Sequence, residues 1–224
     1  MSSDYTYGVG GSCHRIVVCS GDHALLAAAT DAPIRSAEDL QRIARQAAAE
    51  FASGMPCVTR EFLFGCALSE VRETVAQAFR DGASDALTEL APLIATVDAL
   101  RAALIGSSGR PLLETAELQL LHYPQGGSFR RHVDDRPGIK IGAHGRTDVR
   151  RSISFLIYLT RDDWDPAADG GALRFHTAQH GLIDVNPWPG TLAIFDSAKL
   201  PHEVLTTRRE RMCVAGWFHE VRAA

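Results

Sequence analysis

The tripeptide His132-Val133-Asp134 places an imidazole and a carboxylate two residues apart. In an extended strand these two positions project from the same face, so both side chains could reach one metal ion. Imidazole nitrogen and carboxylate oxygen together suit Fe(II). Because the chain contains nine histidines and sixteen aspartates, such a tripeptide arises easily by chance. It predicts a metal site only if a further ligand is present.

His202 is the candidate for that ligand, since it directly follows Pro201 at the start of a predicted strand. A proline is tolerated before a strand and fixes the direction from which the chain approaches it. Two histidines and one aspartate can form a facial triad that leaves coordination positions of Fe(II) open. Taken alone, His202 is typical of an ordinary strand-end histidine, so the prediction depends on the combination.

Arg211 follows His202 by nine residues and leads into the apolar run 212–218. An arginine inside a β-structured core needs an anionic partner, because an unpaired buried guanidinium is costly. A dicarboxylate could pair with it through two parallel hydrogen bonds. Arg208 and Arg209 are rivals for this role, but they precede the predicted strand. On its own, Arg211 would more often be a surface residue.

Two other patterns are weaker candidates. His176 and His180 would share a face only in a helix, whereas their surroundings are typical of a strand and turn. We therefore interpret both as structural or exposed. The glycine-rich run 8–11 lacks the strand-to-helix frame of a phosphate loop, and we interpret it as part of a flexible arm.

The elements that must position these residues change character along the chain. Apolar residues recur at helical spacing in 40–51, 68–79 and 87–104, with Ser36 as a possible N-cap and Pro92 predicted to bend the third helix. After the breaker residues 106–111, short runs of β type follow one another. The predicted strands are 117–123, 152–159, 172–175, 182–185, 191–195, 203–206 and 212–218. Residues 1–35 are assigned no element, although 15–19 is a short β-like run. Helices followed by many short strands predict an α+β fold with an antiparallel sandwich or jelly roll.

Composition supports one globular domain of 1–224. Within it, we expect 1–110 to be mainly helical support and 111–224 to form the jelly-roll core that holds the candidate residues. The chain is 46% hydrophobic and 22% charged with a net charge of -4, which argues against disorder and against nucleic-acid binding. We expect a cytoplasmic location, no membrane segment, and reduced cysteines, since five cysteines form no CxxC pair. Basic residues exceed acidic ones in 130–151, and this excess could attract an anionic substrate or belong to a solvated loop.

Four motifs within 120–220 occur in the order found in one enzyme family. They are Tyr123-Pro124 before His132-Val133-Asp134, the segment from Tyr158 to Trp164, the segment from Gly170 to Phe175, and Pro201-His202-Glu203-Val204 followed by Arg211 and Trp217. This region resembles the catalytic core of the 2-oxoglutarate-dependent prolyl hydroxylases, in particular the oxygen-sensing group. The resemblance implies a double-stranded β-helix (jelly roll) core that uses Fe(II), 2-oxoglutarate and O2.

The resemblance also implies a role for each matched position. By this resemblance, iron is bound by His132, Asp134 and His202. The distal carboxylate of 2-oxoglutarate is bound by Arg211 and Tyr158. The pocket is lined by Tyr123, and Trp217 packs beside it. The structural alternative for the two tyrosines and the tryptophan is a core side chain. A carboxylate at position 134 favours hydroxylation over halogenation.

The implied activity is hydroxylation of an unactivated C–H bond, with a prolyl residue of a protein or peptide as the expected substrate. Two alternatives stay open: a hydroxylase of free amino acids or natural products, and a non-catalytic jelly-roll module that binds a metal as a sensor. The segment 135–150 is longer than its counterpart in the oxygen sensors. We hypothesise that it forms part of a substrate lid.

Overall fold

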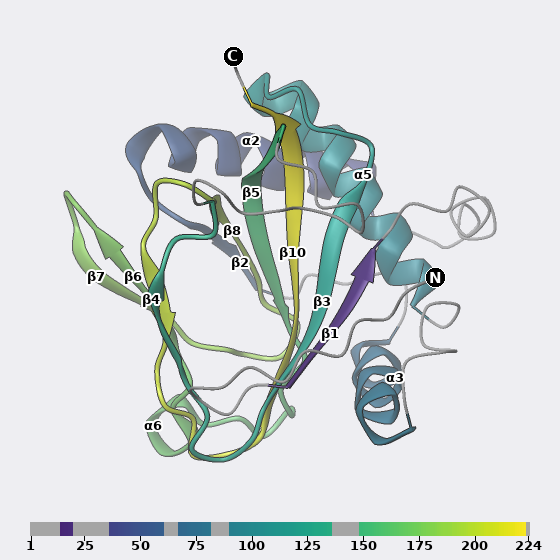
Figure 1. Ribbon diagram of the computed structural model, residues 1–224, viewed down its shortest axis with the longest axis vertical. Helices are drawn as coiled ribbons and strands as arrows, with labels where there is room; N and C mark the ends of the chain where they lie inside the picture. The colour runs from purple at the N-terminus through teal and green to yellow at the C-terminus, as the bar shows by residue number, and fades with distance from the viewer. Residues whose placement is uncertain (1–13, 20–35, 61–66, 82–89, 136–147, 223–224) are drawn as a thin grey trace.

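Two antiparallel β-sheets pack against each other in this computed structural model, and three longer helices lie beside the larger sheet (Figure 1). The larger sheet has the order β1 (His14–Cys19), β3 (Ala116–Tyr123), β10 (Arg211–Val221), β5 (Val149–Tyr158), β8 (Leu192–Asp196) and β2 (Cys57–Thr59). The smaller sheet has the order β4 (Phe129–His132), β9 (His202–Val204), β6 (Leu173–Thr177) and β7 (Gly181–Val185). The structure describes residues 14–19, 36–60, 67–81, 90–135 and 148–222.

The helices are α2 (Ala37–Ser53), α3 (Leu68–Asp81), α5 (Ala91–Ser108) and the short α6 (Pro166–Asp169). The predicted N-cap is confirmed, because the Ser36 hydroxyl accepts a hydrogen bond from the Asp39 amide. The expected bend at Pro92 is wrong. Pro92 lies in the first turn of α5, where a missing N–H costs no intrahelical hydrogen bond, so it starts the helix. Leu87 lies outside the described residues.

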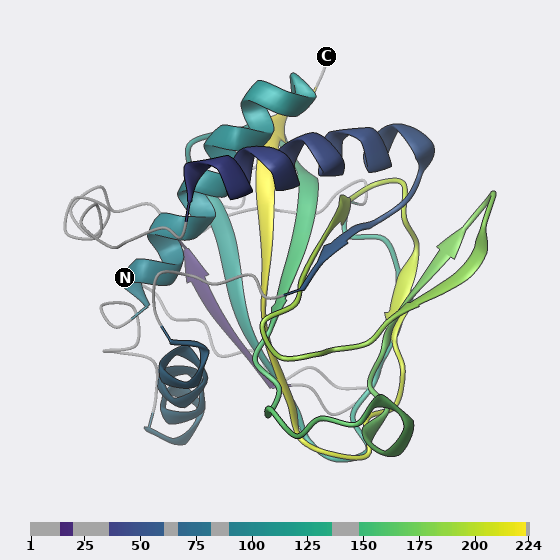
Figure 2. The same cartoon turned by 180° about the vertical axis from the view of Figure 1, so that it is seen from behind.

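Each face of the larger sheet has its own apolar cluster. On β10, Val214 and Phe218 join the cluster that includes the buried faces of α2 and α5, whereas Cys213, Ala215 and Trp217 join a cluster shared with the smaller sheet. This alternation is the period of two of a β-strand. Figure 2 shows α2 and α5 crossing the outer face of the larger sheet. The space between the sheets is therefore left for inward-facing side chains.

The predicted strands are recovered with shifted ends. The run 152–159 became β5, which starts three residues earlier, and the run 203–206 shortened to β9. Sequence patterns missed β2 and β4, which have three and four residues. The predicted α+β architecture with a jelly-roll core and helical support is confirmed. No described helix combines the length and apolar character needed to cross a membrane.

Candidate metal centre and co-substrate pocket

His132 and His202 are cross-strand neighbours in the smaller sheet. His132 is the last residue of β4, His202 is the first of β9, and the two are paired in the β4–β9 register. Their ring centroids are 4.3 Å apart. One potential ligand atom each from His132, His202 and Asp134 lie within 4.8 Å of one another, a group that could hold a metal ion.

Each histidine presents its Nε2 atom toward this group because Nδ1 is occupied elsewhere. Nδ1 of His132 lies 2.9 Å from the carbonyl oxygen of Arg130, and Nδ1 of His202 lies 2.9 Å from that of Leu200. A carbonyl can only accept, so each Nδ1 donates its proton there, and Nε2 is the ring nitrogen that faces the group. Burial lowers the pKa of His202. This imidazole is thus kept in the neutral form that binds metals.

Asp134 reaches the group by a different route from the one the sequence predicted. The expectation of a single extended strand through 132–134 is wrong, because β4 ends at His132 and Asp134 lies in a bend. Its amide donates to the carbonyl oxygen of Ser197 at 3.0 Å. Burial alone would raise the pKa of Asp134, but hydrogen bonding to His132 and the nearby His202 outweigh it and hold this pKa far below its usual range.

Arg211 is fully buried at the start of β10, on the inner face of the larger sheet. Nε donates to the carbonyl oxygen of Gly171 at 3.0 Å, and Nη1 donates to Sγ of Cys213 at 3.4 Å. Among the described residues, Nη2 has no hydrogen-bond partner and no carboxylate forms an ion pair with this guanidinium. A buried charge in this state is costly. The site therefore fits an anionic group supplied from outside the chain.

Two tyrosines flank this guanidinium. Tyr123 pairs with Arg211 across β3 and β10, and Tyr158 pairs with Cys213 across β5 and β10. Both ring centroids lie 5.0 Å from Cζ of Arg211. The Tyr158 hydroxyl is buried without a partner in the described part of the chain, and burial raises its pKa. A protonated phenol and an incompletely paired guanidinium thus offer hydrogen-bond donors in one pocket.

Trp217 belongs to the same inner cluster as Tyr123 and Tyr158. It pairs with Ser154 across β10 and β5, and the guanidinium of Arg151 lies 3.8 Å from the centroid of its ring. Phe195 packs against His202 with a centroid distance of 4.7 Å. The polar groups of both sites are therefore embedded in aromatic side chains.

The weaker sequence candidates do not join this group. His176 lies on β6 and pairs with Glu203 at 2.9 Å, and His180 is exposed. Arg209 pairs with Asp163, and Arg208 donates to carbonyl oxygens of α6. Residues 8–11 and most of the proposed lid, 136–147, lie outside the described residues.

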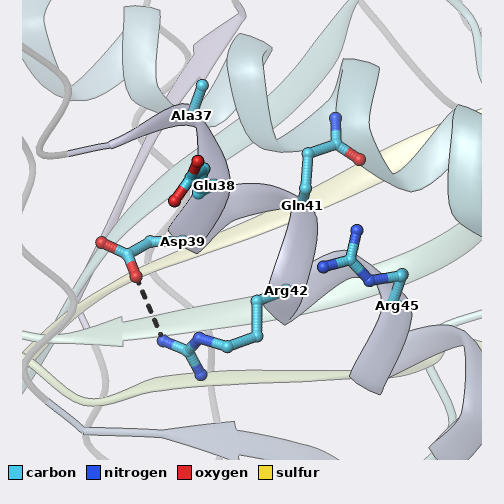
Figure 3. A pocket seen from close by; sticks show the side chains of 6 residues that line it. All are labelled: Ala37, Glu38, Asp39, Gln41, Arg42 and Arg45. Carbon is cyan, nitrogen blue, oxygen red and sulfur yellow. Dashed lines mark hydrogen bonds and ion pairs between the residues drawn. The ribbon is translucent and has the colours of Figure 1, made fainter.

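A separate pocket runs along α2 on the outer side of the larger sheet (Figure 3). It is lined by Ala37, Glu38, Asp39, Gln41, Arg42 and Arg45. Arg42 and Asp39 form an exposed ion pair within it at 3.5 Å. All lining residues come from one helix, and none belongs to the histidine–aspartate group, so this pocket is distinct from the candidate centre.

Comparison with known proteins agrees with this geometry. Residues 118–219 match the family described as the 2OG-Fe(II) oxygenase superfamily. A prolyl-4-hydroxylase from Pseudomonas putida is 30% identical in sequence, with 80% of this chain and 90% of that chain covered and a TM-score of 0.61. The chain belongs to the 2OG-Fe(II) oxygenase superfamily.

More distant structures share the fold of this 2OG-Fe(II) oxygenase. A prolyl hydroxylase from Trichoplax adhaerens, solved with a peptide of hypoxia inducible factor, is 19% identical over 81% of this chain and 90% of that chain, with a TM-score of 0.68. A prolyl 4-hydroxylase from Phytophthora capsici is 19% identical over 84% and 67%, with a TM-score of 0.63. No curated protein matches in a sequence comparison.

Membership of the family confirms the predicted enzyme class and cofactors. The chain is a 2-oxoglutarate-dependent dioxygenase of prolyl hydroxylase-like type, and the family uses Fe(II), 2-oxoglutarate and O2. The donor set described above, two imidazoles and one carboxylate, fits Fe(II). The incompletely paired Arg211 fits a carboxylate of 2-oxoglutarate.

Sequence reasoning missed three residues of this region: Gly171, Ser154 and Ser197. Gly171 was matched only as part of the segment from Gly170 to Phe175 and given no role of its own, yet its carbonyl oxygen holds Arg211. Ser154 lies four residues before Tyr158 in β5, so the strand period places it on the same inner face. That period is a usable signal for its direction. Nothing in the local sequence indicates that Ser197 meets it there.

Proposed function

We propose that His132, Asp134 and His202 hold Fe(II), and that Arg211 and Tyr158 bind the distal carboxylate of 2-oxoglutarate in a pocket lined by Tyr123 and flanked by Trp217. The observation that carries this proposal is that Nη2 of Arg211 has no hydrogen-bond partner among the described residues, although Arg211 is buried on the face of the larger sheet that packs against the smaller sheet with His132 and His202. Metal and co-substrate would each satisfy groups that the described residues leave incompletely paired.

The protein's own contribution follows from the geometry of these groups. The Nδ1 hydrogen bonds of both histidines fix the ring directions and keep Nε2 available for the metal. Arg211 and Tyr158 orient the co-substrate by charge and by donated hydrogen bonds, and the surrounding aromatic rings exclude water. When bound, iron would let O2 act as the oxidant of both 2-oxoglutarate and the substrate: one oxygen atom would go into succinate as CO2 is released, and the other would hydroxylate a C–H bond.

For the substrate, we propose a prolyl residue of a protein or peptide. This choice of substrate is supported by the 30% identity to the Pseudomonas putida prolyl-4-hydroxylase over most of both chains. A free amino acid or a natural product remains the alternative substrate within the same class of reaction. A metal-binding sensor without turnover is the alternative from another class.

The test is anaerobic reconstitution with Fe(II) and 2-oxoglutarate, followed by addition of O2 and measurement of succinate. Proline-containing peptides should stimulate succinate release and gain one oxygen atom by mass, whereas free amino acids should not. Stimulation by free amino acids alone would reject the peptide substrate but keep the enzyme class. Metal binding without any succinate would favour the sensor.

Two histidine variants make the assignment of ligands specific. His132→Ala should abolish turnover, whereas His176→Ala, on β6 and paired with Glu203, should retain it. Full turnover in His132→Ala would refute the proposed centre.

A further inference from the structure

The two carboxylate oxygens of Asp134 lie in different surroundings. Oδ1 is 3.2 Å from Nε2 of His132 and 3.7 Å from Nε2 of His202. Oδ2 accepts a hydrogen bond of 2.7 Å from Oγ of Ser154. One oxygen therefore faces the proposed metal position, while the other is held by the protein.

The direction of the protons beyond Asp134 can be worked out. Oγ of Ser154 lies 2.7 Å from Oγ of Ser197 as well as from Oδ2 of Asp134. Each hydroxyl has one proton to donate, and an ionised carboxylate can only accept. Ser154 therefore donates to Asp134, and Ser197 must donate to Ser154. Both serines are buried, with 1% and 0% of their surface exposed, so water cannot readily replace either donor.

Ser197 also fixes the backbone around this relay. Its carbonyl oxygen accepts from the amides of Asp134 and Asp135, both at 3.0 Å, and its own amide donates to the carbonyl oxygen of Ser152 at 3.2 Å. Ser197 thus joins the loop at Asp134 to strand β5. The position of the Asp134 backbone and the orientation of its carboxylate are set by the same partner.

The neighbouring Asp196 holds the turn that leads to His202. Its Oδ1 accepts from the amides of Ala198 and Lys199, both at 3.0 Å, which holds the turn between β8 and β9. Its Oδ2 accepts from Nη2 of Arg110 at 2.5 Å, in the segment after α5. The turn that leads to His202 is therefore tied to the helical side of the larger sheet.

We propose that Ser154 and Ser197 are positioning residues for the metal centre: their relay holds Oδ2 of Asp134 and leaves Oδ1 alone to bind the metal. The inference rests on the proposed function, since it assumes that Asp134 is a ligand. A carboxylate bound through one oxygen occupies one coordination position rather than two. The relay thereby preserves open positions at the metal.

Loss of the relay should therefore be visible in metal binding. Ser154→Ala leaves Oδ2 buried without a donor and free to turn toward the metal. Removing a hydrogen-bond partner of a ligand typically weakens metal affinity by about 10–100-fold. Ser197→Ala leaves the Ser154 donor in place, so we expect a smaller loss in the same direction. Ser154→Thr keeps the hydroxyl on a strand that favours β-branched residues and should restore most of the affinity.

The experiment titrates the full-length, metal-free protein with Co(II), whose visible absorption spectrum reports the coordination of the ion. Ser154→Ala should show the weaker affinity and an altered spectrum, while Ser154→Thr resembles wild type. Ser152→Ala is the matched control, because its buried hydroxyl donates to Glu220 rather than to Asp134. It should retain the wild-type affinity and spectrum even if thermal unfolding shows lower stability.

The outcomes separate this inference from the proposed function. Wild-type Co(II) affinity and spectrum in Ser154→Ala would overturn the positioning role, provided that His132→Ala loses the metal. Wild-type affinity in His132→Ala would overturn the proposed centre itself. Should Ser154→Ala fail to fold, Ser197→Ala decides: a several-fold loss of affinity supports the relay, and an unchanged affinity and spectrum reject it.

Discussion

Arg211 carries a charge whose partners among the described residues are a carbonyl oxygen, a thiol and two aromatic rings, none of which bears a negative charge. Arg211→Lys keeps the charge but loses the planar fork that binds a carboxylate through two hydrogen bonds. One charge-assisted hydrogen bond is worth about 1.5–3 kcal/mol, so the KM for 2-oxoglutarate should rise by about 10-fold or more. Steady-state rates of succinate release at varied concentrations of 2-oxoglutarate measure this KM.

Arg209→Lys is the matched control for this change. Arg209 also forms ion pairs, but with Asp163 and Asp169 near the surface, and 31% of its side chain is exposed. Its replacement should leave the KM for 2-oxoglutarate unchanged. Equal values for wild type and Arg211→Lys would remove Arg211 from the proposed co-substrate site.

Gly171 leaves room for the side chain of Arg211 because it has no side chain of its own. Its φ is +70°, and an added Cβ would lie 3.1 Å from Cδ of Arg211 and 3.1 Å from Oγ1 of Thr207. Gly171→Ala should therefore lower stability through backbone strain and also displace the guanidinium. We expect a rise of about 10-fold in the KM for 2-oxoglutarate, on the same energy scale as one charged hydrogen bond.

Gly181→Ala separates these two effects. Gly181 has a similar φ of +69°, but nothing lies within 4 Å of an added Cβ. This variant should lose about 1 kcal/mol of unfolding free energy from the strained backbone with an unchanged KM. A common effect of both variants on KM would show that strain, not crowding of Arg211, is responsible.

Residue types and spacing were enough to predict His132, His202 and Arg211 as candidates, because each carries a functional group that a β-structured interior must pair. Tyr158 was named only through the resemblance to the prolyl hydroxylases. They were not enough for Ser197. A serine after a strand is common, and its role depends on a meeting with the loop at Asp134. Contacts between segments distant in sequence leave no local periodicity.

At the scale of elements, β10 depends on a glycine, Gly216, at a position with no room for a side chain. Gly216 pairs with Phe155 of β5, and an added Cβ would lie 2.1 Å from Cζ of that ring. Overpacking typically costs 1–3 kcal/mol, and a contact this short at the centre of a sheet belongs at the upper end. Gly216→Ala should lose about 3 kcal/mol of unfolding free energy, measured by urea denaturation.

A second substitution tests the stated cause of that loss. Phe155→Leu removes the ring that meets the added Cβ, so the double variant Gly216→Ala/Phe155→Leu should be more stable than the sum of the two single losses predicts. Strict additivity would place the cause elsewhere in β10.

Element prediction succeeded where the pattern was long and failed where the tertiary structure decided. The strands β3 and β10 follow from long apolar runs in the sequence, and most of their residues are buried. The three residues of β2 show no pattern of their own, and pairing with β8 alone makes them a strand. Asp134 was expected in a strand, yet hydrogen bonds to Ser197 hold it in a bend.

At the scale of the whole molecule, the two faces of the larger sheet bury different kinds of side chains. Its outer face is covered by apolar residues of α2, α3 and α5. Its inner face also carries charged groups, among them Glu117 on β3 and Arg151 on β5, which pair at 2.7 Å. A purely apolar interior would leave no place for a charged co-substrate, and this ion pair lies on the side of the sheet away from the helices.

The ion pair of Glu117 predicts how the stability of the molecule depends on pH. Burial alone would raise the pKa of Glu117, but the ring of His219, whose Nε2 lies 3.5 Å from Oε2, and hydrogen bonds from Arg151 and Gln119 lower it from 4.5 to about 2. A lowered pKa gives stability that is present above the unfolded value and is lost as pH falls toward the folded value. Each pH unit corresponds to about 1.4 kcal/mol, so the contribution at neutral pH is on the order of 3 kcal/mol.

Glu117→Gln isolates this contribution from that of the other carboxylates. The variant should be less stable than wild type at neutral pH, because Arg151 loses its partner, but its unfolding free energy should fall less between about pH 5 and pH 2. Urea unfolding across this range measures both slopes, with the exposed Glu114→Gln as the control for loss of one carboxylate. If wild type and Glu117→Gln lose stability in parallel as pH falls, the buried pair does not set the acid sensitivity of the fold.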